Sequence, residues 1–232
     1  MEIIRRERSV IIACDVDLEL FERIVEETGD IPGVGGYKLG FYLGLRYGLE
    51  KVVEVAREYT EKPLIYDHQK AATDIPALGE KFAKLCAQCG INAVILFPQA
   101  GPETERKWVK EALNEGLGVV VGGLMTHRGY TDTEGGWIRA DRIEKIYEIA
   151  ADLGVNNFVV PGNRPEEARR IRGWVEGKVK PIFYVPGLIA QGGKVEKVRE
   201  VLGRRWHAIV GRGIYRSEDM RNAALEIVKE LK

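Results

Sequence analysis

Two aspartates and a lysine stand within eight positions in "YDHQKAATDI", which covers residues 66–75. Asp67, Lys70 and Asp74 could form a catalytic array, because carboxylates and an ammonium group are side chains that serve in acid–base chemistry. A solvated turn with ordinary surface charges is the alternative for any short charged segment. His68 lies among them without neighbours in a metal-ligand pattern, so we expect no metal site there. The elements that surround the segment must decide between the two interpretations.

Eight short segments rich in apolar and β-branched residues recur along the chain, with helical patterns between them. The predicted strands are residues 9–15, 35–40, 63–67, 92–97, 117–124, 156–160, 180–185 and 207–211. The predicted helices include residues 18–28, 48–60, 142–154 and 165–177. Short apolar strands are typical of a parallel sheet that is buried on both faces.

Eight such units within 232 residues predict an α/β fold, a single-domain (β/α)8 TIM barrel over residues 1–232. A doubly wound open sheet is the alternative, but it more often has fewer strands. The segment after the first strand, "DVDLE", also lacks the glycine-rich fingerprint of dinucleotide-binding folds.

Composition excludes several classes of function. The chain has 35 Lys and Arg residues and 35 Asp and Glu residues, so no basic field favours a nucleic-acid partner. No segment is long and apolar enough for a membrane span, and the N-terminus lacks a signal-peptide pattern. Cys86 and Cys89 have CxxC spacing, but no second pair completes a zinc site. We expect packing thiols and a reducing, cytoplasmic location.

Polar residues gather at the predicted C-terminal ends of the strands, where barrels of this kind place their active sites. They are Asp15, Lys38, Asp67 with Lys70 and Asp74, Thr126 with His127, residues 186–193, and Gly211 with Arg212. The fourth strand is an exception, because it ends at Phe97 and Pro98. Lys38 stands in an apolar segment, where it could extend its ammonium group out of the barrel mouth or lie buried beside carboxylates, for which Asp67 and Asp74 are the candidates.

The loops after the last two strands carry the clearest signal for a ligand. "VPGLIAQGG" (185–193) offers glycines and a glutamine amide, and "IVGRGIY" (209–215) offers a glycine and an arginine. Backbone N–H groups, the start of a helix and one guanidinium group can together hold a phosphate dianion. Tight turns between strand and helix are the alternative. After the sixth strand, Arg164 could contact a ligand or stabilise a turn.

Together these segments resemble a known family. "YKLG", "GLMTH", "VVPGNRPEEARRIR", "PGLIAQGG" and "IVGRGIY" are similar to motifs of orotidine 5′-monophosphate decarboxylase, in particular the compact archaeal type. The resemblance runs over nearly the whole chain. It implies conversion of orotidine 5′-monophosphate (OMP) to UMP and CO2 in pyrimidine biosynthesis, with no metal or organic cofactor. It also implies a homodimer.

The resemblance implies a role for each matching residue. Lys70 would donate the proton, with Asp67, Asp74 and Lys38 in its charge network, and Asp74 would reach the neighbouring subunit's site. The implied substrate-binding residues are Asp15 and Lys38 for the ribose, Thr126 for the pyrimidine, Gln191, Gly192, Gly193, Gly211 and Arg212 for the phosphate, together with Ile75 and Pro186.

The charged array departs from the family pattern. The family usually has Asp-x-Lys-x-x-Asp, whereas Asp67, Lys70 and Asp74 have one extra residue in each gap. Because side chains alternate along a strand, one extra residue turns Lys70 to the opposite face unless the backbone bulges or turns early. We therefore predict an irregularity in the third strand. Leu78 replaces a common threonine of the family, and Thr126 replaces a serine.

Two alternative functions remain open. One is a Mg²⁺-dependent sugar-phosphate decarboxylase or aldolase of the same superfamily, which commonly has an acidic residue at the position of Lys38. An ammonium group would repel a metal ion there. The other is a non-catalytic paralogue that binds a nucleotide, which the altered spacing and Leu78 would favour.

Overall fold

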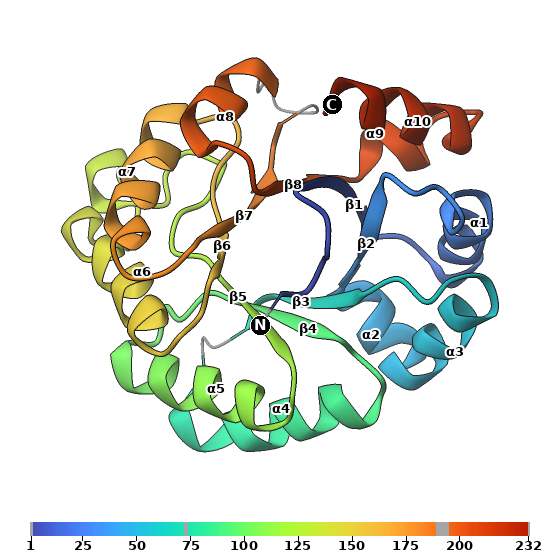
Figure 1. The fold of residues 1–232 in the computed structure, drawn as a ribbon. Coiled ribbons are helices and arrows are strands. Elements are labelled where there is room, and N and C mark those ends of the chain that lie inside the picture. Colours follow the sequence, from blue (N-terminus) through green and yellow to red (C-terminus); the bar gives the residue numbers. More distant parts are fainter. Residues whose placement is uncertain (1, 72–73, 189–194, 232) are drawn as a thin grey trace.

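Eight parallel strands form a closed barrel in the order β1 to β8. The computed structural model describes residues 2–71, 74–188 and 195–231, and for residues 69–71 it describes the backbone alone. Helices surround the barrel as an outer ring (Figure 1). The strands are β1 (Arg8–Cys14), β2 (Val34–Gly40), β3 (Leu64–Ala71), β4 (Ala93–Leu96), β5 (Gly118–Val121), β6 (Asn157–Val159), β7 (Ile182–Pro186) and β8 (Trp206–Val210). The prediction of a (β/α)8 barrel is confirmed.

The helices alternate with the strands as the apolar spacing predicts. They are α1 (Leu18–Thr28), α2 (Phe41–Tyr47), α3 (Leu49–Tyr59), α4 (Gly79–Gln88), α5 (Pro102–Asn114), α6 (Ile143–Asp152), α7 (Pro165–Glu176), α8 (Val195–Leu202), α9 (Arg212–Tyr215) and α10 (Met220–Glu230). Short 3-10 turns are η1 (Pro76–Leu78), η2 (Asp132–Glu134) and η3 (Ala140–Arg142). Side-chain caps fix two helix starts: the Asp17 carboxylate accepts from Leu20 N at 2.9 Å at the start of α1, and the Asp219 carboxylate accepts from Asn222 N at 2.8 Å at the start of α10.

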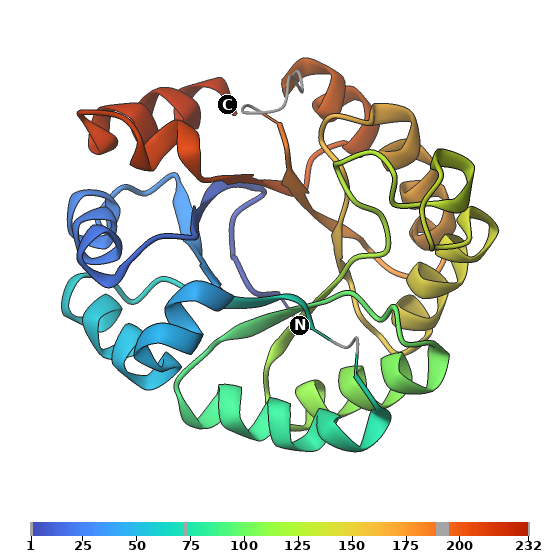
Figure 2. The same ribbon diagram turned by 180° about the vertical axis from the view of Figure 1, so that it is seen from behind.

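The strands separate two hydrophobic cores, because successive side chains point to opposite faces. The larger core lies between barrel and helices. The smaller one fills the barrel interior and includes Ile11, Ile65, Ile95 and Tyr184. Ile4 belongs to this inner core, and the dark-blue segment before β1 runs across the end of the barrel in both views (Figures 1 and 2).

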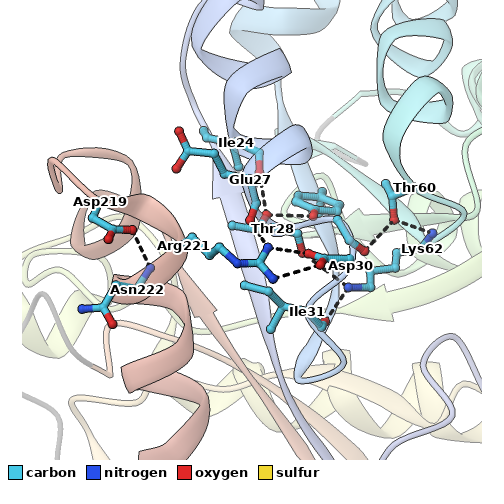
Figure 3. A network of polar contacts seen from close by, with 12 residues as sticks. Ile24, Glu27, Thr28, Asp30, Ile31, Thr60, Lys62, Asp219, Arg221 and Asn222 are labelled. Atoms are coloured by element: carbon cyan, nitrogen blue, oxygen red, sulfur yellow. Dashed lines mark hydrogen bonds and ion pairs between the residues drawn. The ribbon is translucent and has the colours of Figure 1, made fainter.

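A polar network ties the elements at the N-terminal end of the barrel (Figure 3). The Arg221 guanidinium in α10 binds Asp30 at 2.6 and 2.9 Å and donates to Glu27 O at 2.9 Å. Lys62, just before β3, donates to Ile31 O at 2.5 Å. Thr28 donates to Ile24 O at 2.6 Å. These contacts hold the C-terminal end of α1, far in the fold from the strand ends where barrels place active sites.

His207 is the buried titratable group of β8. Its Nδ1 lies 2.8 Å from Ser9 Oγ, and its ring contacts the edge of Tyr184 at 5.2 Å between centroids. Burial, and to a smaller extent the nearby Arg205, lower the pKa of His207 to about 3. The imidazole is therefore neutral in the folded chain at neutral pH.

We expect this histidine to make folding sensitive to acid. The unfolded chain protonates His207 near pH 6.5, and the folded chain does so only near 3. The contribution of the neutral imidazole to the free energy of unfolding is therefore complete above pH 6.5 and is lost progressively as the pH falls below it. Between pH 7 and 5 the free energy of unfolding should fall ~2 kcal/mol more in the wild type than in His207→Gln. Urea titrations of both chains measure this difference, in which the contributions of shared carboxylates cancel. Parallel pH profiles would contradict the assignment.

Candidate active site

Lys38 is the centre of a buried charge network at the C-terminal ends of three adjacent strands. Its Nζ lies 3.2 Å from Asp67 Oδ2 and 3.4 Å from Asp15 Oδ2. Lys38 and Asp67 are buried, and the Asp15 side chain is 45% exposed. β2 pairs with β1 and β3, which sets the ends of these strands side by side. Of the two alternatives for Lys38, burial beside carboxylates is the one observed.

The two carboxylates keep Lys38 charged. Burial by itself would lower the pKa of the ammonium group, but the attraction of Asp67 and Asp15 and their hydrogen bonds outweigh it, and the pKa rises above its ordinary value. A buried cation without such partners would cost several kcal/mol or lose its proton. The network therefore places a fixed positive charge, flanked by negative ones, at the mouth of the barrel.

This network faces a cavity of about 120 Å³ inside the barrel mouth. Besides Lys38 and Asp67, its walls include Thr126 and Pro186 from the sequence-predicted site. The remaining lining residues are apolar: Ile95, Phe97, Leu124, Met125, Val159 and Ile209. Sequence reasoning missed these six, although interior positions of the predicted strands would have indicated several. A mostly apolar pocket with few converging polar groups is the usual form of a small-molecule site.

β3 has the predicted irregularity within the charged array. Tyr66 pairs with Val94 and Ala71 pairs with Leu96, so β3 advances by five residues while β4 advances by two. Three residues of β3 are therefore extra in this interval, which contains Asp67 and Lys70. The backbone of Lys70 belongs to β3, and its side chain lies outside the described part of the structure.

Asp74 and Ile75 follow β3 on a segment that is anchored to α5. Thr104 Oγ1 donates to Asp74 O at 2.9 Å, and Trp108 Nε1 donates to Ile75 O at 3.1 Å. Both residues are exposed, with Ile75 at 59%. The structure thus fixes their backbone and leaves their side chains at the surface of this chain, where Asp74 is not among the lining residues of the barrel-mouth cavity.

The segment after β5 is held by the loop after β6. Asn163 Nδ2 donates to Thr126 O at 3.1 Å, and Arg164 donates to His127 O at 2.9 Å. Arg164 also pairs with Glu134 at 2.8 Å. Of the two expectations for Arg164, these contacts support the one in which it stabilises a turn.

The structure describes only part of the predicted phosphate-binding loops after β7 and β8. Pro186 is the last residue of β7, and Gly211 and the exposed Arg212 follow β8. A side chain at Gly211 would come within 3.1 Å of Ala13 O, so glycine permits this close approach of β8 to β1. Gln191, Gly192 and Gly193 lie outside the described residues.

The CxxC pair lies in and just after α4. Cys86 is buried, and burial raises the pKa of its thiol to about 12, so it is a neutral packing group. Within residues 2–71, 74–188 and 195–231, no three His, Cys, Asp or Glu residues gather as a metal site. In the same ranges no helix is long and apolar enough to cross a membrane.

Comparison with known proteins places the chain in a family. The sequence matches the family described as "Orotidine 5'-phosphate decarboxylase / HUMPS family" over residues 8–227. The chain belongs to this family. A relative named orotidine 5'-phosphate decarboxylase, from Methanosarcina mazei, is 32% identical over 97% of this chain and 96% of its own length. One from Methanocaldococcus jannaschii is 30% identical over 93% and 94%.

Solved structures agree with this assignment. The orotidine 5'-monophosphate decarboxylase of Methanocaldococcus jannaschii, complexed with the inhibitor BMP, superposes with a TM-score of 0.84 at 29% identity, covering 97% of this chain and 99% of the other. The Pyrococcus horikoshii enzyme superposes with a TM-score of 0.78 at 25% identity, covering 96% and 98%. Leu78, which stands where the family commonly has threonine, lies in η1 and packs against the outer hydrophobic core.

Removing the central charge of this family member should destabilise it. In Lys38→Met the buried Asp67 loses the ammonium group that lies 3.2 Å away, and we expect the free energy of unfolding at pH 7 to fall by ~3 kcal/mol. The added change Asp67→Asn should recover part of the loss, because it removes the charge left without Lys38. Urea unfolding of the single and double variants measures both effects. A double variant less stable than Lys38→Met would contradict the pairing.

Proposed function

We propose that the chain is an orotidine 5′-monophosphate decarboxylase, which converts OMP to UMP and CO2 without a metal or organic cofactor. The observation that carries the proposal is the buried Lys38–Asp67–Asp15 network at the barrel mouth of a chain that belongs to this family. Relatives of this name match nearly the whole chain, and one solved neighbour was complexed with the inhibitor BMP. A cytoplasmic location is part of the proposal.

Lys70 is the proposed proton donor, and the register of β3 supports an inward position for it. Ala71 pairs with Leu96, which belongs to the outer core, while Ile95 belongs to the inner one. Paired residues of parallel strands share a face, so this backbone register favours the inner face for position 70. Because three is an odd number, the extra residues let positions 67 and 70 share a face of the strand, which regular alternation would not allow.

Charge placement explains the chemistry. Loss of CO2 from C6 of the pyrimidine leaves a carbanion, and a cationic Lys70 beside that carbon stabilises the charge and then supplies the proton. Asp67 lies near the substrate carboxylate, where like charges disfavour the ground state relative to the less localised transition state. Lys38 holds Asp67 in place, which keeps the array rigid before the substrate binds.

The remaining residues bind the substrate around this centre. Their proposed roles are Asp15 and Lys38 for the ribose hydroxyls, Thr126 for the pyrimidine edge, Ile75 and Pro186 for further contacts, and Gln191, Gly192, Gly193, Gly211 and Arg212 for the 5′-phosphate. The phosphate lies far from C6, yet its binding energy can offset closure and desolvation at the reacting end.

A homodimer is part of the proposal, with Asp74 completing the partner's site. The apolar side chains that flank β3 support it, since they would otherwise lie in water. These exposed residues are Phe41, Tyr42 and Leu45 of α2, Leu85 of α4, and Ile75 just before η1. They lie in elements next to the segment that carries Asp74, whose own side chain is exposed.

The sugar-phosphate alternative is less consistent with the site. A divalent cation beside Asp67 would meet the ammonium group of Lys38, which lies 3.2 Å from the same carboxylate. The fall in absorbance as OMP is consumed, followed with EDTA present, distinguishes the alternatives. Activity that survives the chelator supports the proposed enzyme. Because a sugar-phosphate enzyme acts on another substrate, no turnover of OMP would favour either of the two alternatives, and loss of OMP turnover with EDTA would contradict a metal-free reaction.

The variant Lys70→Ala separates chemistry from binding. We expect turnover to fall below detection while UMP still binds, because the phosphate and ribose contacts do not use this ammonium group. Calorimetric titration with UMP and the absorbance assay measure the two properties on the same preparation. Normal turnover by this variant would refute the role of Lys70.

Mixing two inactive variants tests the shared site. A hybrid dimer of Lys70→Ala and Asp74→Asn chains contains one site in which both groups are native, if Asp74 acts across the interface. Random exchange makes about half of the dimers hybrid, so the mixture should recover about a quarter of wild-type activity. A mixture that stays inactive after denaturation and joint refolding would show that Asp74 acts within its own chain.

A further inference from the structure

The hydroxyl of Tyr147, in α6, lies between two strands of the barrel. Gly123 N, just after β5, donates to this hydroxyl at 3.0 Å. The hydroxyl donates its own proton to Val159 O, at the end of β6, at 2.9 Å. One side-chain oxygen therefore bridges two backbone groups that belong to neighbouring strands.

This hydroxyl occupies the place of a backbone hydrogen bond. β5 and β6 pair at Val120 with Asn157 and at Val121 with Phe158. In a parallel ladder of that register, the next bond would run from Gly123 N directly to Val159 O. Because the Tyr147 oxygen bonds both groups instead, the two strands separate at their C-terminal ends while neither group is left unsatisfied.

The surroundings hold the tyrosine ring in one position. Tyr147 is fully buried, and its ring lies 6.0 Å from those of both Phe158 and Trp174. A side chain at Gly123 would come within 3.1 Å of Tyr147 Cε2, so glycine permits the close approach. Burial raises the pKa of the Tyr147 phenol well above its ordinary value, so the hydroxyl keeps the proton with which it hydrogen-bonds Val159 O.

The separated strand ends lead directly into the candidate active site. Leu124, Met125 and Thr126 follow Gly123 and line the barrel-mouth cavity, and Val159 lines it from the other side. Asn163 holds the far end of this segment through Thr126 O at 3.1 Å. Tyr147 thus fixes the start of the segment and Asn163 its end, although Tyr147 itself is absent from the cavity wall.

We propose that Tyr147 is a positioning residue that sets the distance between the ends of β5 and β6 and thereby places Thr126 for the pyrimidine ring. The inference rests on the proposed function, which assigns Thr126 to that ring. Its consequence is selective. Contacts to the base depend on the hydroxyl, whereas contacts to the phosphate, after β7 and β8, do not.

The variant Tyr147→Phe removes the hydroxyl and keeps the ring. Gly123 N and Val159 O must then close on each other or stay unpaired, and either outcome shifts the segment that leads to Thr126. We expect UMP to bind about tenfold more weakly, the effect of roughly one hydrogen bond, while ribose 5-phosphate binds as to the wild type. Calorimetry with the two ligands measures the split, and retained binding of ribose 5-phosphate also shows that the variant is folded.

A double-mutant cycle tests the route through Thr126. If Tyr147 acts by placing Thr126, then Tyr147→Phe should add little to the loss of UMP affinity already caused by Thr126→Ala. Fully additive losses would overturn the proposal, because the tyrosine would then act by another path. Equal weakening of UMP and ribose 5-phosphate would overturn it as well, since that is the result of general structural damage.

Tyr37→Phe is the matched control. Tyr37 is also fully buried, and its hydroxyl lies 2.9 Å from Thr28 Oγ1 at the opposite end of the barrel. We expect this variant to lose stability without any change in UMP affinity. If Tyr147→Phe binds UMP as tightly as the wild type does, the role of Tyr147 is refuted and the proposed function still stands. If the wild-type chain itself fails to bind UMP, the proposed function is refuted.

Discussion

A buried ammonium group is the constraint on which the site depends. Lys38 lies inside the barrel mouth, and its charge is tolerable only because Asp67 and Asp15 approach within 3.2 and 3.4 Å. Those carboxylates come from the strands on either side of β2, so the barrel must close in register for the charges to meet. The network in turn fixes a charged wall opposite apolar ones, which is the asymmetry that a polar substrate with one reacting end requires.

Irregular backbone at two strand ends adapts this regular barrel to its site. In β3, three extra residues between Tyr66 and Ala71 shift the register of the strand against β4. Between β5 and β6, the Tyr147 hydroxyl replaces a backbone bond and separates the strand ends. Both departures lie at the C-terminal ends of strands, while the network around Arg221 and Asp30 at the other end uses ordinary helix-end contacts.

The sequence predicted the barrel because each strand and helix carries its own local signal, such as the Asp17 cap or the apolar run before Asp67. It also predicted the irregularity of β3, since the spacing of the charges demands one. It did not predict that Asp15 rather than Asp74 would be the second partner of Lys38, because that choice depends on three-dimensional approach. The insertion of Tyr147 was equally out of reach: a buried apolar position in a helical pattern does not reveal a hydroxyl that replaces a bond between strands.

The position of the Lys70 ammonium group is the central claim, and a crystal structure of the chain with UMP tests it most directly. The account predicts that Lys70 Nζ points into the barrel mouth, within about 3 Å of an Asp67 oxygen and facing C6 of the pyrimidine. A Lys70 side chain on the outer face of β3, directed toward the helices or solvent while UMP occupies the cavity, would contradict it.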